Sequence, residues 1–224
     1  MDNYDGDKET LKHVLNDITR VNKILGGNGI TVAAVFRLIK ENSKESYTIL
    51  DMGCADGNML RILADEAKRR NITLHLIGVD LNADALNIAR KLSVEYPEIT
   101  YYQKDILDAV FTDMQVDIVL TTLTMHHFKN DDIQRFLHQF VKLASIGIVI
   151  NDLQRSKVAY YLFRIFSLIF IKTKVAKIDG LISISKGFKR KELAAFSKNL
   201  KEVSHTIQWK WAFRYAWVMR KKRL

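Results

Sequence analysis

Glycines, carboxylates and histidines that could bind a ligand or move a proton recur between residues 51 and 152. The first group is Asp51, Gly53 and Gly57, within the segment YTILDMGCADGNML at residues 47–60. Glycine has no Cβ atom, so the backbone there can bend sharply or lie against a ligand. A helix that begins after the second glycine directs free N–H groups and its positive dipole end toward the loop. The segment predicts a strand, a ligand-binding turn and a helix.

Polar side chains also end the later apolar runs. They are Asp80, Asp105, His126 with His127, and Asn151 with Asp152. Ligands of an open parallel sheet bind outside the carboxyl ends of its strands, so we expect these side chains at one rim. An acid that follows the strand after a glycine loop suits the two hydroxyls of a ribose. Asp80 could instead cap the next helix, although Asn82 can do so as well.

The two histidines are candidates for a general base. The apolar runs at residues 116–121 and 147–151 should form neighbouring strands, which would bring His126 or His127 close to Asp152. A carboxylate beside an imidazole raises its basicity and fixes its tautomer. Either histidine could instead have a structural role, packing in the core or capping the next helix. We take His126 with Asp152 as the first candidate pair and His127 as the alternative.

The elements that would position these residues alternate as βαβ units do. Continuously apolar runs are typical of parallel strands covered on both faces. Strands are expected at residues 48–52, 74–80, 100–104, 116–121 and 147–151. Amphipathic helices are expected at residues 57–70, 82–96 and 131–145. We expect Asp131 to cap the last of these helices.

Two helices are expected before the first strand. The first carries an apolar face over residues 8–25 and ends at Gly26 and Gly27. Thr31 is expected to cap the second, which ends near Asn42. They would cover the sheet or form a lid.

The pattern changes after Asp152. Residues 158–171 are apolar apart from Arg164 and Ser167, and are shorter than the roughly 20 residues of a spanning helix. They predict a buried or lid helix. Irregular structure is expected at residues 172–187, a helix at 189–198, and a hairpin of strands at about 202–209 and 213–220. The fold class is therefore α/β, with a doubly wound, mostly parallel sheet of seven strands.

The amino-acid composition indicates a globular protein from a reducing compartment. The 224 residues are 48% hydrophobic and 27% charged, as in a globular domain. Cys54 is the single cysteine, so we expect no internal disulfide, no metal site built from thiolates and a reducing compartment. We also expect no other metal site. The acidic first ten residues are unlike a secretory signal, and we expect a cytoplasmic protein without a membrane span. The net charge is +10, with a cluster of four basic residues at 220–223. Such a cluster could bind nucleic acid or an anionic membrane surface, and we interpret it as a solvated tail.

These motifs resemble those of the class I S-adenosylmethionine-dependent methyltransferases over nearly the whole chain. The matching segments are ILDMGCADG, GVDLN, QKDI and DIVLTTLTMHHF. The resemblance implies that S-adenosylmethionine is the cofactor and that the fold is Rossmann-like. It implies that Asp80 holds the ribose with Leu81 against the adenine, and that Asp105 faces the adenine amino group with Ile106 beside the ring.

The same resemblance assigns the methionine part of the cofactor to the glycine loop. Asp51, Gly53 and Gly57 would shape that pocket, and the full expected cofactor set also contains Cys54, Ala55 and Thr122. Ala55 departs from the pattern, because many members have a glycine there. Alanine costs little there if its φ is negative, so we expect an altered loop shape without loss of binding.

The segments NDLQRSKVAYYLFRIF and GFKRKELAAF, with the aromatic last hairpin, resemble bacterial small-molecule methyltransferases of ubiquinone- and polyketide-type pathways. This implies a small aromatic or lipid-like acceptor that carries a hydroxyl, with no nucleic acid as partner. Aromatic side chains that would line its pocket, or else belong to the core, are Tyr160, Tyr161, Phe163, Phe166, Trp209 and Trp211. A homodimer stays open.

We expect one domain with four parts. They are an N-terminal helical cover (1–46), a cofactor-binding core (47–152), a lid and helix (153–200) and a C-terminal hairpin (201–224).

Three other functions share parts of this pattern. A nicotinamide-dependent oxidoreductase would have Gly-x-Gly-x-x-Gly, whereas this loop has Gly-x-x-x-Gly, and Asp105 would lack a role. A nucleic-acid methyltransferase would fit the positive charge, but amino-group methylation typically uses an Asn/Asp-Pro-Pro-aromatic motif that is absent after the fourth strand. Methylation of a cytosine carbon needs a cysteine nucleophile, and Cys54 lies in the cofactor loop. A non-catalytic binding module would not need Asp80 and Asp105.

Overall fold

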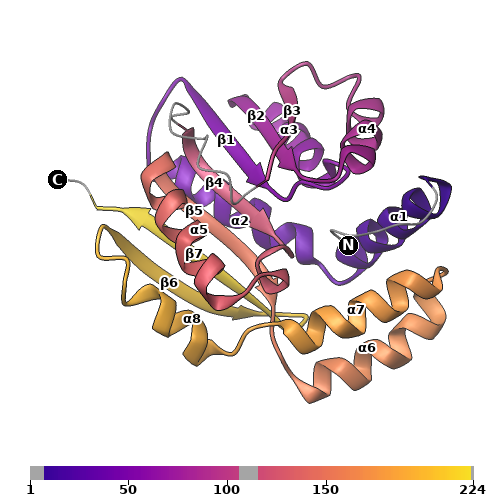
Figure 1. Cartoon of the computed structure of the whole chain (residues 1–224). Coiled ribbons are helices and arrows are strands. Elements are labelled where there is room, and N and C mark those ends of the chain that lie inside the picture. Colours follow the sequence, from indigo (N-terminus) through magenta and orange to yellow (C-terminus); the bar gives the residue numbers. More distant parts are fainter. Residues whose placement is uncertain (1–7, 106–115, 223–224) are drawn as a thin grey trace.

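The computed structural model describes residues 8–105 and 116–222, which form an α/β structure around one sheet (Figure 1). In this part of the chain the sheet has seven strands in the order β3-β2-β1-β4-β5-β7-β6. The strands are β1 (Ser46–Met52), β2 (Thr73–Asp80), β3 (Ile99–Gln103), β4 (Val116–Thr122), β5 (Ala144–Leu153), β6 (Val203–Lys210) and β7 (Arg214–Lys221). This order and number confirm the predicted fold class.

Strand direction follows from the connections. β1 to β5 are parallel, because helices join most of them and return the chain to the same edge. β6 and β7 are joined by three residues and pair antiparallel, and β7 also pairs antiparallel with β5. Since β4 lies between β1 and β5, the order of the strands reverses beside β1, where ligands of such sheets bind.

Helices cover both faces of the sheet. The helices are α1 (Lys8–Ile24), α2 (Gly27–Lys40), α3 (Asn58–Arg69), α4 (Ala83–Leu92), α5 (Asn130–Leu143), α6 (Lys157–Phe170), α7 (Lys174–Lys186) and α8 (Arg190–Ser197), with a 3₁₀ turn η1 (Met125–His127). Apolar residues of α2, α3 and α4 form one core cluster with the sheet. Apolar residues of α5 and α8 form a second core cluster with the sheet, which includes Trp217, a side chain that is 1% exposed. The sheet is thus doubly wound.

Helices α1, α6 and α7 form a separate layer beside the carboxyl ends of the parallel strands (Figure 1). Val14 and Val21 of α1 pack against Ile171 and Ala176 of the α6–α7 hairpin. Asp17 of α1 is buried and accepts hydrogen bonds from the backbone N–H groups of Lys172 and Thr173 at 3.0 and 2.7 Å, and from the Thr173 hydroxyl at 2.9 Å. One carboxylate therefore holds the hairpin turn onto α1.

Two predicted helix caps are wrong. Thr31 lies inside α2, because the helix begins at Gly27 after Gly26 adopts a left-handed conformation. The Thr31 hydroxyl instead accepts a hydrogen bond from Asn151 Nδ2 at 2.9 Å. Asp131 lies in the first turn of α5 and Lys129 occupies the cap position, so the acid faces the positive helix end without capping it.

The prediction of irregular structure at residues 172–187 is also wrong, since α7 occupies most of that segment. Its β-branched residues and Gly180 obscure the helical pattern, but tertiary packing compensates. A Cβ atom on Gly180 would lie 2.5 Å from Cε1 of Phe163, so this glycine lets α6 and α7 approach closely. Thr173 caps α7 by accepting from the N–H of Ala176 at 3.3 Å.

The helix expected at residues 82–96 ends at Leu92, before Pro97. No helix in the described residues is long and apolar enough to cross a membrane.

Candidate active site

A cavity of about 620 Å³ lies between the carboxyl ends of the parallel strands and the layer of α1, α6 and α7. It is lined by the glycine loop, by residues that follow β2 and β4, and by the inner sides of these three helices. Its size is in the range of ligand sites in proteins. The cavity brings together most of the predicted cofactor-binding residues with His126 and His127.

The glycine loop has the tight geometry that its residues predict. Gly53 and Gly57 have φ values of +79° and +72°. A Cβ atom on Gly53 would lie 2.5 Å from Cγ2 of Thr124, and one on Gly57 would collide with the hydroxyl of Tyr101. The N–H groups of Gly53 and Cys54 donate to the carbonyl of Val79 at 2.8 and 3.0 Å. Both glycines are therefore required by the backbone.

The condition set for a low cost of alanine at position 55, a negative φ, is not met. The φ of Ala55 is +47°, the left-handed region, in which a Cβ atom costs roughly 1 to 2 kcal/mol. Leu123, after β4, has φ +56°. Both residues line the cavity, and strained backbone of this kind is concentrated at ligand sites.

Asp80 connects β2 to the glycine loop. Its Oδ2 accepts from the N–H of Ala55 at 2.8 Å, and its Oδ1 accepts from the N–H of Asn82 at 2.9 Å. Asn82 caps α4 by accepting from the N–H of Ala85 at 3.0 Å, so the cap does not need Asp80. Each carboxylate oxygen can accept a second hydrogen bond, and Asp80 lines the cavity.

Asp51 is buried at the base of the cavity. Its Oδ1 has no hydrogen-bond partner among the described residues. Burial, together with the negative charge of Asp80, raises the pKa of Asp51 to about 8. A cationic group bound in the cavity would stabilise the ionised form of this acid.

The remaining predicted cofactor residues also lie at the cavity wall. Leu81 is 48% exposed and Asp105 follows β3 at the same rim. Cys54 is buried, which raises the pKa of its thiol, and Thr122 contacts Thr31 across the cavity edge with their hydroxyl oxygens 3.3 Å apart. Ile106 lies outside the described residues.

His126 and Asp152 form a buried pair. The Nδ1 atom of His126 lies 2.6 Å from Oδ1 of Asp152, and the backbone N–H of His126 donates to Oδ2 at 3.3 Å. Burial would raise the pKa of Asp152, but the adjacent His126 ring and the N–H of Leu153 outweigh it, so the pKa lies below its ordinary value. An ionised Asp152 accepts the proton of Nδ1, which leaves the lone pair on Nε2.

The other ring nitrogen of this pair, Nε2, is buried. Nε2 of His126 has no hydrogen-bond partner in the part of the chain that the structure describes, and the residue lines the cavity. His127 also lines the cavity, with its ring centroid 4.2 Å from that of His126. The structure thus brings His126, rather than His127, into direct contact with Asp152.

Sequence reasoning missed Arg214, the first residue of β7. Its side chain is 2% exposed and lines the cavity, with Nη2 donating to Oδ1 of Asn22 at 2.7 Å. Nε and Nη1 have no partner among the described residues. Burial lowers the pKa of Arg214 to about 10, against the attraction of Asp152, so the group stays cationic at neutral pH. Arg214 is a basic residue at the start of an aromatic strand, and nothing in the local sequence indicated that it would be buried.

The predicted aromatic lining is correct in part. Phe163, Phe166 and Trp211 line the cavity. Tyr160, Tyr161 and Trp209 are not among its lining residues, and Tyr161 is 60% exposed. The inner surface of α7 also contributes, through Asp179, Gly180, Ser183 and Ile184, as does α1.

Comparison with known proteins agrees with this geometry. A family model described as a methyltransferase domain matches residues 49–147, which contain the glycine loop, Asp80, Asp105 and His126. The matched segment is less than half of the chain, and together with the fold it supports the predicted class I methyltransferase family.

A curated relative of the methyltransferase domain is the methyltransferase ausD of Aspergillus calidoustus. It is 33% identical over 111 residues, which are 46% of this chain and 38% of that protein. The chain thus covers well under half of the length of this relative.

Solved structures share the fold of the whole chain. The plantazolicin methyltransferase BpumL, in complex with a triazolic desmethylPZN analog and SAH, aligns with a TM-score of 0.74 and 16% identity over 98% of this chain and 92% of that one. Magnesium protoporphyrin IX methyltransferase from Synechocystis PCC 6803, with bound SAM, aligns with a TM-score of 0.62 and 10% identity over 98% and 100% of the two chains. At these identities the likeness concerns the fold.

Proposed function

We propose that this chain transfers a methyl group from S-adenosylmethionine to a hydroxyl oxygen of a small apolar or aromatic acceptor. The observation that carries the proposal is the His126–Asp152 pair: Nε2 of His126 has no hydrogen-bond partner among the described residues, and His126 lines the same cavity as the glycine loop and Asp80. A cofactor site and a positioned base in one cavity are what such a reaction needs.

The residues present fit this cofactor. Asp51 offers a buried, unpartnered carboxylate oxygen to the cationic methionine part, and Asp80 offers carboxylate lone pairs to the ribose hydroxyls. Leu81 and Asp105 lie at the rim where the adenine would be held. When bound, S-adenosylmethionine supplies an electrophilic methyl group on a sulfonium, which leaves as a neutral thioether. The SAH or SAM in the solved neighbours supports this assignment.

The chain's own residues would then activate and shield the acceptor. Asp152 holds the proton on Nδ1 of His126, so Nε2 can accept the hydroxyl proton as the new oxygen–carbon bond forms. Apolar side chains of α1 and α6, such as Ile18, Phe163 and Phe166, line the other side of the cavity and exclude water. The unpartnered N–H groups of Arg214 offer the acceptor one polar anchor in this apolar wall.

His126→Ala tests the role of the base. With a panel of phenolic and lipid-like alcohols and labelled S-adenosylmethionine, we expect the variant to lose about 10² to 10⁴-fold in turnover. Its affinity for SAH, measured by calorimetry, should be nearly unchanged, because the ring does not hold the cofactor. His138→Ala, which removes an exposed histidine of α5, is the matched control and should keep full turnover.

Equal turnover of His126→Ala and wild type on a neutral hydroxyl acceptor would contradict the role of the base. Absence of any binding of SAH or S-adenosylmethionine to the wild type would contradict the proposed function itself.

A further inference from the structure

The outer side of α6 carries an exposed apolar surface that the proposed function does not use. We define the outer stripe as Val158, Tyr161, Leu162, Ile165, Leu168 and Ile169, whose exposed fractions run from 49% at Leu162 to 73% at Ile169. Their spacing of three and four residues places them on one side of the helix. Ala159, Phe163, Phe166 and Ser167 occupy the opposite side, which packs toward α7 and the cavity.

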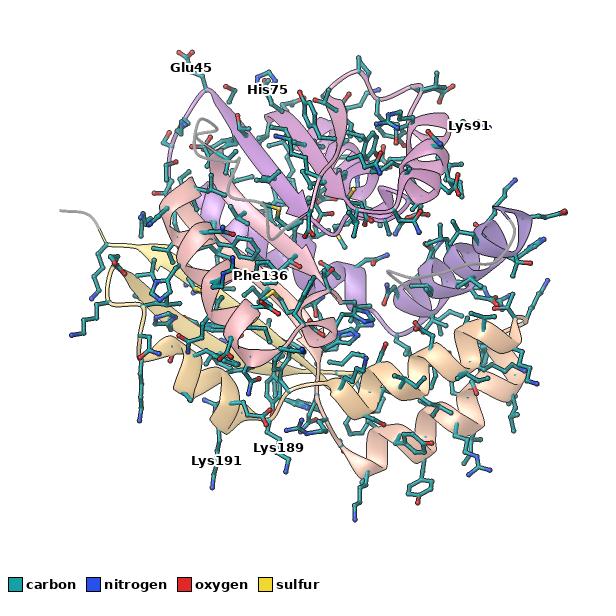
Figure 2. The ribbon with its side chains drawn as sticks, in the orientation of Figure 1. Glu45, His75, Lys91, Phe136, Lys189 and Lys191 are labelled. Atoms are coloured by element: carbon teal, nitrogen blue, oxygen red, sulfur yellow. The ribbon has the colours of Figure 1, made fainter. Side chains whose placement is uncertain are left out.

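A helix with apolar residues on both sides is usually buried on both. In Figure 1, α7 lies between α6 and α1, and α6 forms the outer edge of the molecule. Figure 2 shows side chains projecting from this edge away from the rest of the chain. Six neighbouring large apolar residues at an edge exceed the scattered surface hydrophobics of ordinary proteins, and a surface of this kind marks an interaction site.

The charges around the stripe indicate the kind of partner. Five basic residues flank it: Lys157, Arg164, Lys172, Lys174 and Lys177. No aspartate or glutamate occurs from residue 153 to residue 178. Lys189 and Lys191 project from the same lower edge of the molecule in Figure 2. The partner should therefore combine an apolar interior with a negatively charged surface.

We infer that the outer stripe of α6 docks on an anionic lipid bilayer, with the helix lying in the plane of the interface. Helices with an apolar face and flanking lysine and arginine bind membranes in this way, and each element of that arrangement is present here. α6 has 14 residues and so would lie on the bilayer without crossing it.

Two other occupants fit less well. A second copy of the chain, related by a twofold axis, would bring the same basic residues against each other and repel. A nucleic acid would satisfy the positive charge but has no apolar surface to cover six exposed side chains. A bilayer with anionic headgroups satisfies both features.

Docking in this orientation would also place the cavity near the membrane. Leu162 belongs to the outer stripe and also lines the cavity, and Phe163 and Phe166 line it from the inner side of the same helix. An apolar acceptor could then pass from the bilayer to the site along α6. The docking itself does not depend on methyl transfer, so it can be measured without cofactor or acceptor.

The test is co-sedimentation of the full chain with vesicles of phosphatidylcholine alone or mixed with equal phosphatidylglycerol. We expect binding to the mixed vesicles, weaker binding to the neutral ones, and a decrease as salt is raised. The double variant Ile165→Glu/Ile169→Glu, which alters no cavity-lining residue, should lower the partition coefficient about tenfold or more. Lys172→Glu/Lys174→Glu should lower binding only to the anionic vesicles.

Matched controls change equally exposed residues elsewhere. Leu92→Glu/Val94→Glu replaces two exposed apolar residues, one at the end of α4 and one just after it. Lys68→Glu/Lys91→Glu reverses two exposed charges, on α3 and on α4, where Figure 2 labels Lys91. Both should bind as the wild type does, and unchanged thermal melting would show that each variant is folded.

Three outcomes would overturn the inference. They are a wild type that does not sediment with anionic vesicles, control variants that lose binding as much as the α6 variants, and stripe variants that convert a dimer to a monomer in gel filtration. The last outcome would make the stripe an interface between two copies of the chain.

Discussion

Asp51 is a buried acid at the base of the candidate site, and its ionisation should depend on whether the cavity holds a cation. It is 2% exposed, lies near Asp80, and has a pKa raised to about 8. Without a ligand, the site thus holds a protonated acid at neutral pH. A cation in the cavity would favour the ionised form, so cofactor binding near neutral pH should release a proton.

The raised pKa of Asp51 predicts the pH dependence of stability. Below about pH 4 both folded and unfolded chains hold the proton, and up to about pH 8 only the folded chain does. The free energy of unfolding of the ligand-free protein should therefore fall as pH rises through this window, by up to about 1.4 kcal/mol per pH unit from this group. Asp51→Asn should remove that part of the slope, as measured by urea unfolding at pH 6 and pH 8.

Asp65→Asn, which changes an exposed acid of α3, is the control and should keep the wild-type slope. An Asp51→Asn protein with an unchanged slope would show that Asp51 is already ionised in the ligand-free state.

At the scale of elements, the layer of α1, α6 and α7 depends on a small number of polar contacts. Asp17 accepts three hydrogen bonds from Lys172 and Thr173, and Val14 and Val21 supply the apolar contact beside them. The sheet beneath is held by continuous ladders and two large core clusters. Opening of the layer should therefore require less free energy than unfolding of the sheet.

Asp17→Ala tests this difference. Hydrogen bonds to a charged group contribute about 1.5 to 3 kcal/mol, so amides of α6 and α7 should exchange about 10 to 100 times faster in hydrogen-exchange measurements. Amides of β1, β4 and β5 should change much less. Asp65→Ala removes an exposed carboxylate that accepts a hydrogen bond from the Tyr96 hydroxyl, and it should leave both regions unchanged.

If Asp17→Ala accelerated amide exchange equally in α6, α7 and the sheet, the helical layer would not open separately from the sheet. Asp17 would then stabilise the domain as one unit.

At the scale of the whole molecule, the cavity joins parts that are far apart in the sequence. Residues from α1, the glycine loop, η1, the α6–α7 hairpin and the β6–β7 turn all line it. A ligand bound there would contact both the sheet and the helical layer. It should therefore stabilise the entire fold, because it binds the folded chain and not the unfolded one.

This coupling separates the proposed cofactor from the nicotinamide alternative. SAH at 100 times its Kd should add about 2.7 kcal/mol to the free energy of unfolding, measured as a rise in Tm, whereas NADH should add nothing. Asp80→Ala should need about 10 times or more SAH for the same rise, since it loses charge-assisted hydrogen bonds. Stabilisation by NADH and not by SAH would contradict the cofactor assignment.

Local features of the chain determined most of the fold and the residue types of the cofactor site. Continuously apolar runs define parallel strands, and Gly53 and Gly57 mark a turn whose φ values only glycine adopts readily. Asp80 and Asp105 each follow a parallel strand. Because the carboxyl ends of parallel strands lie at one edge of the sheet, the two acids are expected to lie close together. His126 and Asp152 follow from the same rule, because β4 and β5 are neighbours.

Other features were decided only by tertiary structure. The left-handed conformation of Ala55 is stabilised by the hydrogen bond of its N–H to Asp80, 25 positions away. α7 forms against its own weak propensity because Gly180 admits Phe163 and Asp17 holds the turn before it. The burial of Arg214 and the exposure of the outer stripe depend on which elements pack against each other in the folded chain. The local pattern of residue types does not predict that packing. The physical reason is that propensity and periodicity act within a few residues, whereas desolvation and packing are set by contacts between distant ones.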